Sequence, residues 1–392
     1  MPAPFLLDLS HTSHTRARTG IQRVTRSLHA ALGDRAVAIT HDPHRNAWRE
    51  LQAWERANLA AKSPATSRGA QWPLAAKLGG ATHRLLNRRT ISLPKNAGLI
   101  VPEVFSTHVA RALPALFAAI SGPRIAIFHD AIALKFPELT PAKTVARFPS
   151  YLIELLAFDG VAAVSEDSRD ALADYWRWLG ADNPPPVQAI PLGTDTQIYQ
   201  GNGDTAPTSG PPVVLSVGSI EGRKNHLALL DACERLWACG EKFSLHLIGI
   251  AHAQTGAAAL ARIRTLQAAG RPLRYDGAVG DAAVDAAYAA CAFTVYPSMI
   301  EGFGLPVIES VSHGKPCICS GRGALAESAR GGGCIPLATV DAPAIATAIA
   351  RLLASPAAIA TLVAESRARR HKTWSDYAAE VAAWAGGLGR RP

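Results

Sequence analysis

Short apolar runs alternate with helix-length segments along nearly the whole chain. In the first half, buried strands are predicted at residues 99–101, 125–128, 161–164 and 187–190. Between the last two runs, Asp167 is predicted to cap a helix that passes through Trp176 and stops at Gly180. This alternation is typical of a parallel sheet that is covered by helices.

The alternation is interrupted once and then restarts. Residues 201–212 are polar and rich in Gly, Pro, Ser and Thr, which indicates an interdomain linker. Beyond it, Asn225 is predicted to cap a helix that stops at Gly240, and strands are predicted at residues 213–217, 243–248, 293–296 and 316–319. Two successive series predict two parallel-sheet domains that face each other across a cleft, with ligands at the carboxyl ends of the strands.

Composition excludes several classes of protein. The chain has 392 residues, of which 48% are hydrophobic, so a disordered, collagen-like or disulfide-scaffold chain is excluded. No apolar run approaches the roughly 18 residues that a membrane-spanning helix needs. The apolar run at residues 5–7 ends at Asp8 and is too short for a signal peptide, so we expect a soluble cytoplasmic protein. The six cysteines form no C-x-x-C pair, which favours small buried thiols in a reducing compartment.

The positive charge is concentrated in one block. Residues 16–100 hold 15 Lys and Arg against 4 Asp and Glu, a net charge of +11, while the other residues sum to −2. A basic block of this kind favours anionic partners, such as nucleic acid, phosphorylated ligands or an acidic membrane face. The block carries no motif that reads RNA or DNA, so we expect no specific nucleic-acid partner. We hypothesise instead a peripheral contact with the inner face of an anionic membrane.

The most informative segment is residues 296–309. A predicted strand ends at Tyr296, Gly302 and Gly304 allow a close backbone approach, and Pro306 suits the first turn of a helix. The helix N-terminus would present free N–H groups behind a glycine loop, which is a site for a phosphate or diphosphate. Glu309, about one turn into this helix, could accept hydrogen bonds from a vicinal diol. Alternatively, the glycines only make a turn and Glu309 only complements the helix dipole.

A second cluster follows the first predicted strand of the second domain. Arg223 and Lys224 lie immediately before a predicted helix, again at the ligand-binding edge. Adjacent cations at that edge can neutralise a leaving diphosphate without a metal ion. The alternative interpretation is a pair of solvated surface cations. Two loops suited to phosphate in one domain favour the binding interpretation.

These residues together resemble a known family. Glu301 and Glu309, with seven residues between them that include a Gly-Phe-Gly-Leu-Pro segment, are preceded by the Arg-Lys pair and look like the motifs of glycosyltransferase family 4. The resemblance implies the α/β GT-B fold of two Rossmann-like domains. Residues 1–195 would form the acceptor-binding domain, residues 196–372 the nucleotide-sugar domain, and residues 373–392 a crossover helix and tail that return to the first domain.

The resemblance also implies roles for individual residues. Arg223 and Lys224 would hold the donor diphosphate, Glu309 the ribose hydroxyls and Glu301 the donor sugar. The donor-binding loop would contribute the backbone of Gly302, Phe303, Gly304 and Leu305. Transfer in the family retains the anomeric configuration and needs neither a bound metal ion nor a cofactor. No D-x-D pattern is placed like a metal site in this sequence.

The N-terminal half resembles the family more loosely. Residues 19–24 are similar to the glycine loop that opens these enzymes, although this chain has only Gly20 where many members have two or more glycines. His129, at the end of a predicted strand, is similar to the active-site histidine beside the transferred sugar, and Asp130 could meet the acceptor hydroxyl. Residues 193–195 resemble the hinge motif. The remaining histidines that lack metal-binding spacing are expected to be ordinary surface or core residues: His11, His14, His41, His44, His246, His252 and His313.

The sequence therefore predicts a retaining, metal-independent glycosyltransferase. It would move a hexose from a nucleotide sugar to a glycan or lipid-linked acceptor in polysaccharide or glycolipid biosynthesis. The variant of the glycine loop resembles transferases of bacterial surface polysaccharides, so GDP-mannose is the first expected donor and a UDP-sugar the second. Two alternatives stay open at this point: a non-catalytic protein that binds an anionic surface or nucleic acid, and a Rossmann-type sugar-nucleotide oxidoreductase or epimerase. The last would need a G-x-G-x-x-G motif after the first strand, which this chain lacks.

Overall fold

The computed structural model describes residues 5–18, 20–61, 69–85, 94, 96–194 and 210–391. The chain divides into two compact units. Unit 1 comprises Met1–Lys135, Pro141–Gly193 and Thr373–Pro392, and unit 2 comprises Phe136–Thr140 and Thr194–Lys372. Most of the predicted linker, up to residue 209, lies outside the described residues, as does the hinge residue Asp195.

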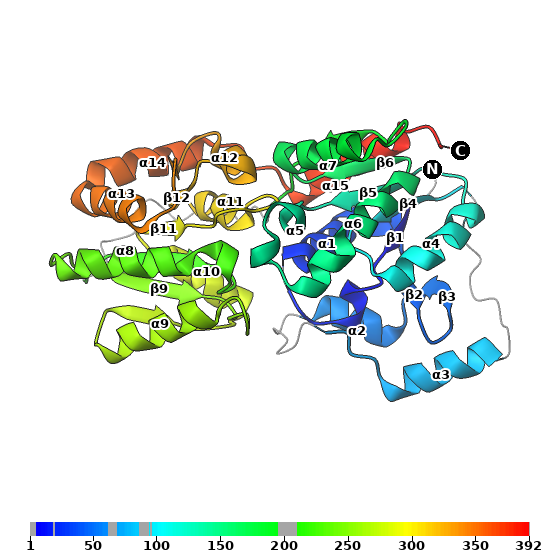
Figure 1. Ribbon diagram of the computed structural model, residues 1–392, viewed down its shortest axis with the longest axis horizontal. Coiled ribbons are helices and arrows are strands. Elements are labelled where there is room, and N and C mark those ends of the chain that lie inside the picture. The colour runs from blue at the N-terminus through cyan, green and yellow to red at the C-terminus, as the bar shows by residue number, and fades with distance from the viewer. Residues whose placement is uncertain are drawn as a thin grey trace. The chain divides into compact units, whose positions relative to one another are not determined.

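Unit 1 is built on a parallel sheet (Figure 1). Its described strands form one seven-stranded sheet in the order β3-β2-β1-β4-β5-β6-β7. Neighbouring strands are parallel, except that β3 runs antiparallel to β2 at the edge. The strands are β1 (Phe5–Asp8), β2 (Ala36–Asp42), β3 (Ala47–Glu50), β4 (Gly98–Val101), β5 (Arg124–Phe128), β6 (Gly160–Ala163) and β7 (Val187–Ala189).

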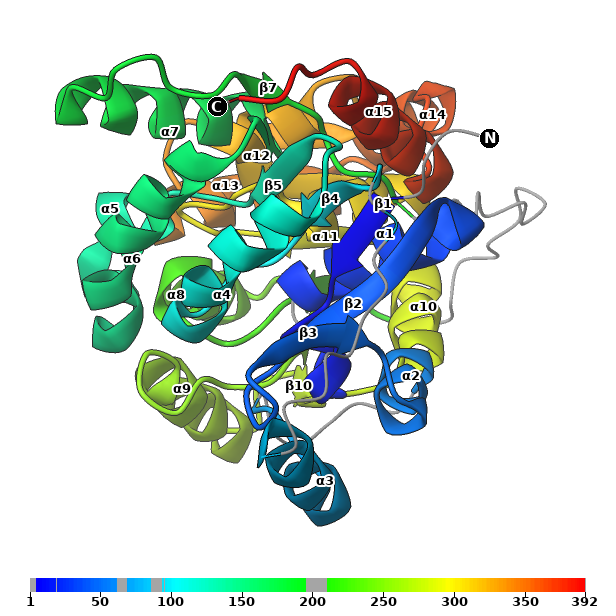
Figure 2. The ribbon, with the colours of Figure 1, turned by 90° about the vertical axis from the view of Figure 1, so that its right-hand side faces the viewer.

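Helices cover both faces of the unit 1 sheet. Alternate residues of a strand point to opposite faces, so Leu6 faces one set of helices and Leu7 the other, and both are fully buried. Figure 2 shows α4 and α6 on one side of the sheet and α1 and α15 on the other. The helices are α1 (Gly20–Leu32), α2 (Ala53–Ala60), α3 (Leu74–Leu85), α4 (Thr107–Ala119), α5 (Ile132–Lys135), α6 (Ala142–Glu154), α7 (Glu166–Leu179) and α15 (Trp374–Gly386), with 3₁₀ helices η1 (Thr12–His14), η2 (Gly33–Arg35) and η4 (Leu155–Ala157).

Unit 2 repeats the same architecture with a fully parallel sheet. Its described strands have the order β10-β9-β8-β11-β12-β13. Val295 packs in a cluster with helices α8, α9 and α13, whereas its neighbour Tyr296 packs with α11 and α12 on the opposite face. The strands are β8 (Val213–Val217), β9 (Ser244–Ile248), β10 (Leu273–Tyr275), β11 (Phe293–Tyr296), β12 (Cys317–Ser320) and β13 (Cys334–Leu337). The helices are η3 (Pro137–Leu139), η5 (Gly222–Lys224), α8 (His226–Ala238), α9 (Ala257–Ala268), α10 (Asp281–Ala290), α11 (Leu305–Ser312), α12 (Gly323–Ala329), α13 (Ala342–Ala354) and α14 (Pro356–Ala368).

The C-terminal helix belongs to the first unit. The chain passes from unit 2 back to unit 1 between Lys372 and Thr373, and α15 then packs against α1. The two points at which the chain changes units lie side by side, because Thr194 N–H donates to the Lys372 carbonyl at 2.9 Å. A crossover helix and tail that return to the first domain were predicted for residues 373–392, and the structure places α15 and these residues in unit 1.

The sequence located strands better than helix caps. All eight predicted strands are present within one residue of their predicted bounds, but β1, β2, β3, β10 and β13 were not predicted. The cap of α7 is a correction: Ser165, not Asp167, accepts a hydrogen bond from Ser168 N–H. Asn225 occupies the predicted N-cap of α8, but its side chain donates to the Val340 carbonyl instead of capping the helix.

Two other expectations bear on the environment of the chain. All six cysteines are free, four of them buried and Cys334 partly buried, but Cys239 is exposed, so the expectation of buried thiols is wrong there. Among the described residues, no single helix is long and apolar enough to cross a membrane. Only α13 and α14 meet that test of length and composition when they are taken together, and they are bent by 98° relative to each other.

Candidate active site

The candidate site in unit 2 forms at the carboxyl ends of two neighbouring strands. β8 leads into η5, which carries Arg223 and Lys224, and the adjacent strand β11 leads into the loop that carries Glu301. The two loops are joined by their backbones, because Met299 N–H donates to the Arg223 carbonyl at 2.9 Å. Ligands bind at this edge in open parallel sheets.

Glu301 is the centre of this site. Its Oε2 atom accepts from Arg223 Nη1 at 2.6 Å, and its Oε1 atom accepts from Lys224 Nζ at 2.5 Å. Oε1 also accepts from Tyr296 Oη at 2.9 Å and from Ser298 Oγ at 2.5 Å. The side chains of Glu301 and Lys224 are each 10% exposed and that of Arg223 is 23% exposed. The predicted alternative of two solvated surface cations is therefore wrong.

The charges of these groups are coupled. Burial alone would raise the pKa of Glu301, but Arg223 and Lys224 outweigh it and lower the pKa to about 2. Burial also lowers the pKa of Lys224 below its usual value, although Glu301 opposes this effect. Arg223 additionally pairs with Glu221 at 2.8 Å. The two cations are thus balanced by two carboxylates, and Glu301 occupies the position in which an anionic ligand would meet both cations.

The N-terminus of α11 borders this cluster. Gly304 is the N-cap with φ of 106°, and a Cβ at this residue would lie 2.9 Å from Leu325 Cδ2, so the turn requires glycine. Pro306 lies in the first turn, as predicted. Glu309 follows within α11 and is 9% exposed. The structure brings Arg223, Lys224 and Glu301 into direct contact, and it places Gly302, Phe303, Gly304, Leu305 and Glu309 on the loop and helix that follow Glu301.

In unit 1, His129 and Asp130 directly follow β5, as predicted. His129 is 6% exposed, and its Nε2 lies 2.7 Å from the Pro102 carbonyl. A carbonyl can only accept, so Nε2 carries the proton. Burial lowers the pKa of His129 below its usual value, although the bond to Pro102 and the nearby carboxylates of Asp130 and Glu103 oppose this shift. The His129 imidazole is therefore neutral near pH 7. The neighbouring Asp130 carboxylate accepts a hydrogen bond from Ile132 N–H at 3.0 Å.

Two carboxyl groups at the same edge were missed from the sequence. β1, β4 and β5 are neighbours in the sheet. Asp8 is the last residue of β1, Glu103 lies two residues after β4, and His129 directly follows β5. Asp8 is 2% exposed and Glu103 4% exposed. Burial raises the pKa of Asp8 to about 7, against the opposing hydrogen bonds from Ser10. The signal that could have identified them is the position of an acidic residue directly after an apolar run.

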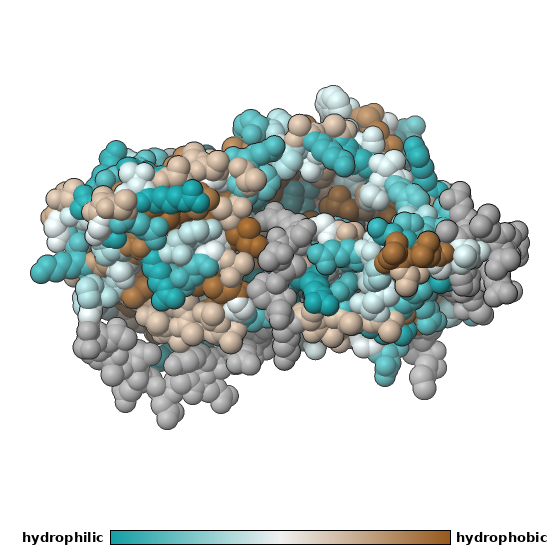
Figure 3. All heavy atoms as spheres, turned by 90° about the horizontal axis from the view of Figure 1, so that it is seen from below, coloured by the Kyte–Doolittle hydropathy of each residue, from teal (hydrophilic) through white to brown (hydrophobic). Residues whose placement is uncertain are grey.

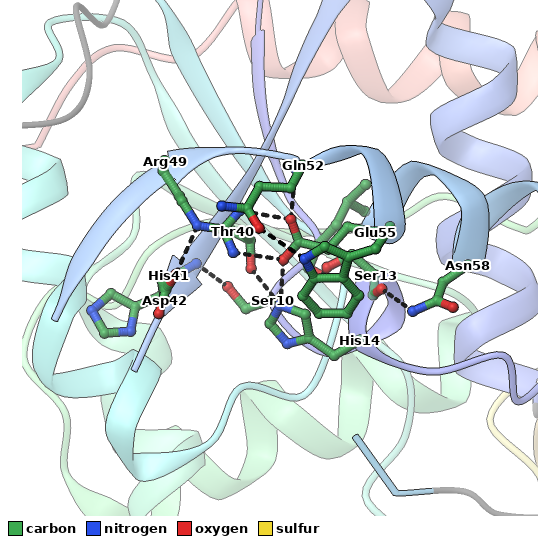
Figure 4. Close-up of polar contacts among 12 residues, drawn as sticks. Ser10, Ser13, His14, Thr40, His41, Asp42, Arg49, Gln52, Glu55 and Asn58 are labelled. Carbon is green, nitrogen blue, oxygen red and sulfur yellow. Dashed lines mark hydrogen bonds and ion pairs between the residues drawn. The ribbon is translucent and has the colours of Figure 1, made fainter. Parts of the chain in front are cut away.

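A chain of buried ionic contacts lies beside this edge (Figure 4). Arg49 donates to Asp42 at 2.8 Å and to Glu55 at 2.6 Å, and Glu55 in turn lies 2.9 Å from His14 Nε2. Trp72 packs on the His14 ring with centroids 4.2 Å apart. The expectation that His14 is an ordinary core histidine is only half right, since it is buried but belongs to this ionic network.

Gly20 is the first residue of α1, and nothing lies within 4 Å of the position that a Cβ would occupy there. The fold therefore does not require glycine at this position. No group of three or more His, Cys, Asp or Glu within the described ranges is placed to hold a metal ion. The independence from metal ions stays a prediction. Chemically, the unit 2 cluster offers two cations and a helix N-terminus to an anion, and unit 1 offers a neutral imidazole and carboxyl groups.

Comparison with known proteins supports the predicted resemblance to glycosyltransferases. Residues 211–355 match the family model "Glycosyl transferases group 1". The chain is 26% identical over 341 residues to the serotype-specific mannosyltransferase WbdA of Escherichia coli, covering 80% of this chain and 38% of that protein. It is 28% identical over 219 residues to the O-antigen chain mannosyltransferase B of Escherichia coli, covering 52% of this chain and 54% of that protein. The chain thus spans little more than a third of the length of WbdA.

Solved structures show the same fold. Sucrose-phosphate synthase from Thermosynechococcus elongatus matches with a TM-score of 0.67 and 19% identity, covering 97% of this chain and 98% of that chain. Anabaena Alr3699/HepE in complex with UDP and glucose matches with a TM-score of 0.69 and 16% identity, covering 98% and 100%. The predicted GT-B fold of two parallel-sheet domains is thereby confirmed.

Proposed function

We propose that this chain, which has the GT-B fold and resembles glycosyltransferases of family 4, moves a hexose from a nucleotide sugar to a hydroxyl of a glycan or lipid-linked acceptor. The observation that carries the proposal is the ion-paired, largely buried cluster of Arg223, Lys224 and Glu301 at the carboxyl edge of the unit 2 sheet. Mannose from GDP-mannose is the first candidate, because two similar proteins are named mannosyltransferases. A UDP-sugar is the second, because HepE was crystallised with UDP and glucose.

The chemistry follows from where charge develops. Glycosyl transfer passes through an oxocarbenium-like centre, and negative charge grows on the leaving diphosphate. Arg223, Lys224 and the N–H groups that begin α11 would stabilise that charge. Glu301 would release the cations to the diphosphate and bind the sugar, and Glu309 would bind the ribose hydroxyls. The departing phosphate would take the acceptor proton on the same face of the sugar, so we propose retention and no need for a metal ion.

The test is a panel of nucleotide sugars that is read by thermal shift and by release of the nucleoside diphosphate. A donor at tenfold its dissociation constant adds about 1.4 kcal/mol to the free energy of unfolding, which a melting curve resolves. Glu309→Ala should weaken donor binding about 10- to 100-fold, because it removes charge-assisted hydrogen bonds. Glu241→Ala, an exposed residue of the same unit, is the control and should bind like the wild type. Absence of both stabilisation and turnover across the panel would contradict the proposal.

A second part of the proposal concerns the setting of the reaction. Between Glu55 and Glu103 the sequence holds eight Lys and Arg and no acidic residue. The helix α3 lies in this stretch and exposes Leu74 and Leu78, 72% and 61% accessible, with Lys77 exposed between them. Figure 3 shows an apolar patch on the face where α3 lies. We propose that this helix contacts an anionic membrane surface at its cytoplasmic face, with the leucines in the interface and the cations at the headgroups.

Flotation with liposomes tests this contact. Wild-type protein should float with vesicles that contain an acidic lipid and should not float with neutral vesicles. The variant Leu74→Ser/Leu78→Ser should lose most of this binding. Leu227→Ser, which changes a 44% exposed leucine in unit 2, is the matched control and should bind like the wild type. Equal binding of the wild type to both kinds of vesicle would remove the proposal.

A further inference from the structure

The loop between β1 and α1 is held by more hydrogen bonds than a simple connection between two elements requires. We define the β1 loop as residues 9–15; it leaves the carboxyl end of a central strand and contains η1. Thr12, Ser13, His14 and Thr15 are between 0% and 3% exposed although all four are polar. Burying a polar group costs free energy unless it is hydrogen-bonded, so the partners of this loop are informative.

The amide side of the loop is held by one carboxylate. Glu103, which follows β4, accepts from His11 N–H at 3.0 Å and from Thr12 N–H at 3.0 Å. The Thr12 hydroxyl donates to the same carboxylate. Glu103 is 4% exposed, so these hydrogen bonds are shielded from solvent. Charge-assisted hydrogen bonds are strong in such an environment.

The backbone carbonyls of the loop accept hydrogen bonds from α1, from α2 and from the segment before α3. Arg26 of α1 donates to the carbonyls of Thr12 at 3.4 Å and Thr15 at 2.6 Å. Asn58 of α2 donates to the Ser13 carbonyl at 3.0 Å. Gln71 N–H donates to the His14 carbonyl at 2.7 Å. Every carbonyl from Thr12 to Thr15 therefore has a donor.

Side chains complete the anchoring (Figure 4). The His41 N–H donates to Ser10 Oγ at 2.8 Å, and Ser13 Oγ donates to the Leu9 carbonyl at 2.7 Å. His14 is fixed by Glu55 at 2.9 Å, as described above. The loop thus has one geometry imposed on it by β2, α1, α2 and the end of β4.

His11 is the residue of the β1 loop that this scaffold leaves exposed. Its backbone is fixed by Glu103, and its ring Nε2 lies 3.1 Å from Nε2 of Gln22, which is 4% exposed. An amide N–H₂ only donates, so with this amide orientation the ring accepts at Nε2 and carries its proton at Nδ1. The backbone and the ring of His11 are thus both held in place, while the side chain remains accessible at the carboxyl edge of the sheet.

We propose that His11 contacts a hydroxyl of the acceptor sugar and that Glu103 is the residue that positions it by holding the β1 loop. The inference rests on the proposed glycosyl transfer and adds the residue that recognises the acceptor. A preorganised donor or acceptor at a fixed position lowers the entropy that binding must overcome. Such preorganisation accounts for a buried carboxylate whose hydrogen-bond partners, within the described part of the chain, lie on this one loop.

Hydrogen exchange of the full-length protein without substrate tests the positioning part. In Glu103→Gln the amide N–H₂ replaces one acceptor oxygen. Either His11 N–H then loses its acceptor, or Thr12 N–H keeps only the longer contact of 3.3 Å while its hydroxyl loses its acceptor. We expect the amides of residues 10–15 to exchange at least tenfold faster than in the wild type, with the melting curve still cooperative. Thr12→Val, which removes only the hydroxyl donor, should give a smaller increase. The control is Glu50→Gln, whose carboxylate is 65% exposed. Unchanged exchange in Glu103→Gln would overturn the positioning role.

Steady-state kinetics with octyl α-mannoside as acceptor test the contact. For His11→Ala we expect the KM for the acceptor to rise at least fivefold, while the KM for the nucleotide sugar stays within twofold. Glu103→Gln should shift the same acceptor KM, and Glu50→Gln should shift neither. An unchanged acceptor KM in His11→Ala, or a change confined to the donor KM, would overturn the inference. If the wild type turns over no nucleotide sugar, it is the proposed function that fails, and the inference fails with it.

Discussion

Lys224 Nζ lies 2.5 Å from Glu301 Oε1, so the second cation of the candidate diphosphate site is already paired with a carboxylate of the same unit. Arg223 is paired with the other oxygen of that carboxylate at 2.6 Å. A nucleotide diphosphate that bound here as proposed would therefore compete with Glu301 for both cations. In the absence of a ligand, Glu301 neutralises the charge of these two largely buried cations. Without a carboxylate beside them, burying both cations would cost considerable free energy.

This competition predicts opposite effects of one substitution on binding and on turnover. Glu301→Gln removes the carboxylate that Arg223 and Lys224 share and leaves only Glu221 beside Arg223, so GDP or UDP should bind several-fold more tightly. Turnover should fall at least tenfold, because the donor sugar loses the group that would position it. Isothermal titration with each nucleoside diphosphate measures the first effect, and initial rates measure the second. Weaker binding of both nucleotides to Glu301→Gln would show that the carboxylate does not compete with them.

Lys224 should matter more for the transition state than for the fold of unit 2. Lys224→Met keeps the length of the side chain but removes a cation from the leaving diphosphate, and kcat should fall about 100-fold, which corresponds to about 3 kcal/mol. Arg223 would still pair with Glu301, so the protein should remain folded. Lys242→Met, at an exposed position in the same unit, is the control and should keep the wild-type rate. A kcat within twofold of the wild type would exclude a role in leaving-group stabilisation.

A substitution at Gly20 should distinguish a role in ligand binding from a role in stabilising the fold. No atom lies within 4 Å of the position of a Cβ at Gly20, and the residue begins α1, so Gly20→Ala should leave the melting temperature unchanged or raise it slightly. If the glycine is there to let a donor phosphate approach, the KM for the nucleotide sugar should rise about tenfold. Gly386→Ala, also open at the Cβ position, is the matched control for thermal unfolding and for kinetics. An unchanged KM in Gly20→Ala would show that no ligand approaches there.

The parts of the fold that the sequence predicted are those with a strong apolar signal. The strands at residues 213–217 and 293–296 are runs of apolar or β-branched residues, broken only by Ser216, between turn residues, and the structure has them with those bounds. β2 and β3 escaped prediction because His41, Asp42 and Arg49 interrupt their apolar pattern. All three side chains are buried, and Asp42 and Arg49 are compensated by their mutual ion pair, which a pattern of hydrophobic positions cannot reveal.

The candidate site was predictable to the extent that it is local in sequence. Arg223 and Lys224 lie in the loop that follows β8, and Glu301 lies in the loop that follows β11, so topology alone predicts that they share one edge. Their direct pairing was not predicted, because residues 77 and 78 positions apart come into contact only through the register of β8 and β11. Glu103 and the β1 loop were missed for the same reason, since their hydrogen bonds join residues 91 and 92 positions apart.

Gly193 should be intolerant of any side chain for a reason unrelated to chemistry. A Cβ at this residue would lie 2.4 Å from the Thr373 carbonyl oxygen, where the chain returns to unit 1. Gly193→Ala must push the two backbone segments apart, and we expect a loss of about 1–3 kcal/mol in the free energy of unfolding. Urea unfolding measures the loss, with Gly386→Ala as a control without a clash. Wild-type stability of Gly193→Ala would show that the two segments separate easily.

Asp8 predicts how stability depends on pH. Its pKa is raised from 3.8 to about 7 by burial, so the native state holds a proton that the unfolded chain releases above pH 3.8. Ionising this carboxyl therefore costs stability progressively as the pH rises from 3.8 to 7, by on the order of 4 kcal/mol once both states are ionised. Asp8→Asn keeps an acceptor for Ser10 but cannot ionise. Relative to the wild type, it should be more stable at pH 8 than at pH 5, as measured by urea unfolding at the two values. An equal difference in stability at both would show that Asp8 titrates normally.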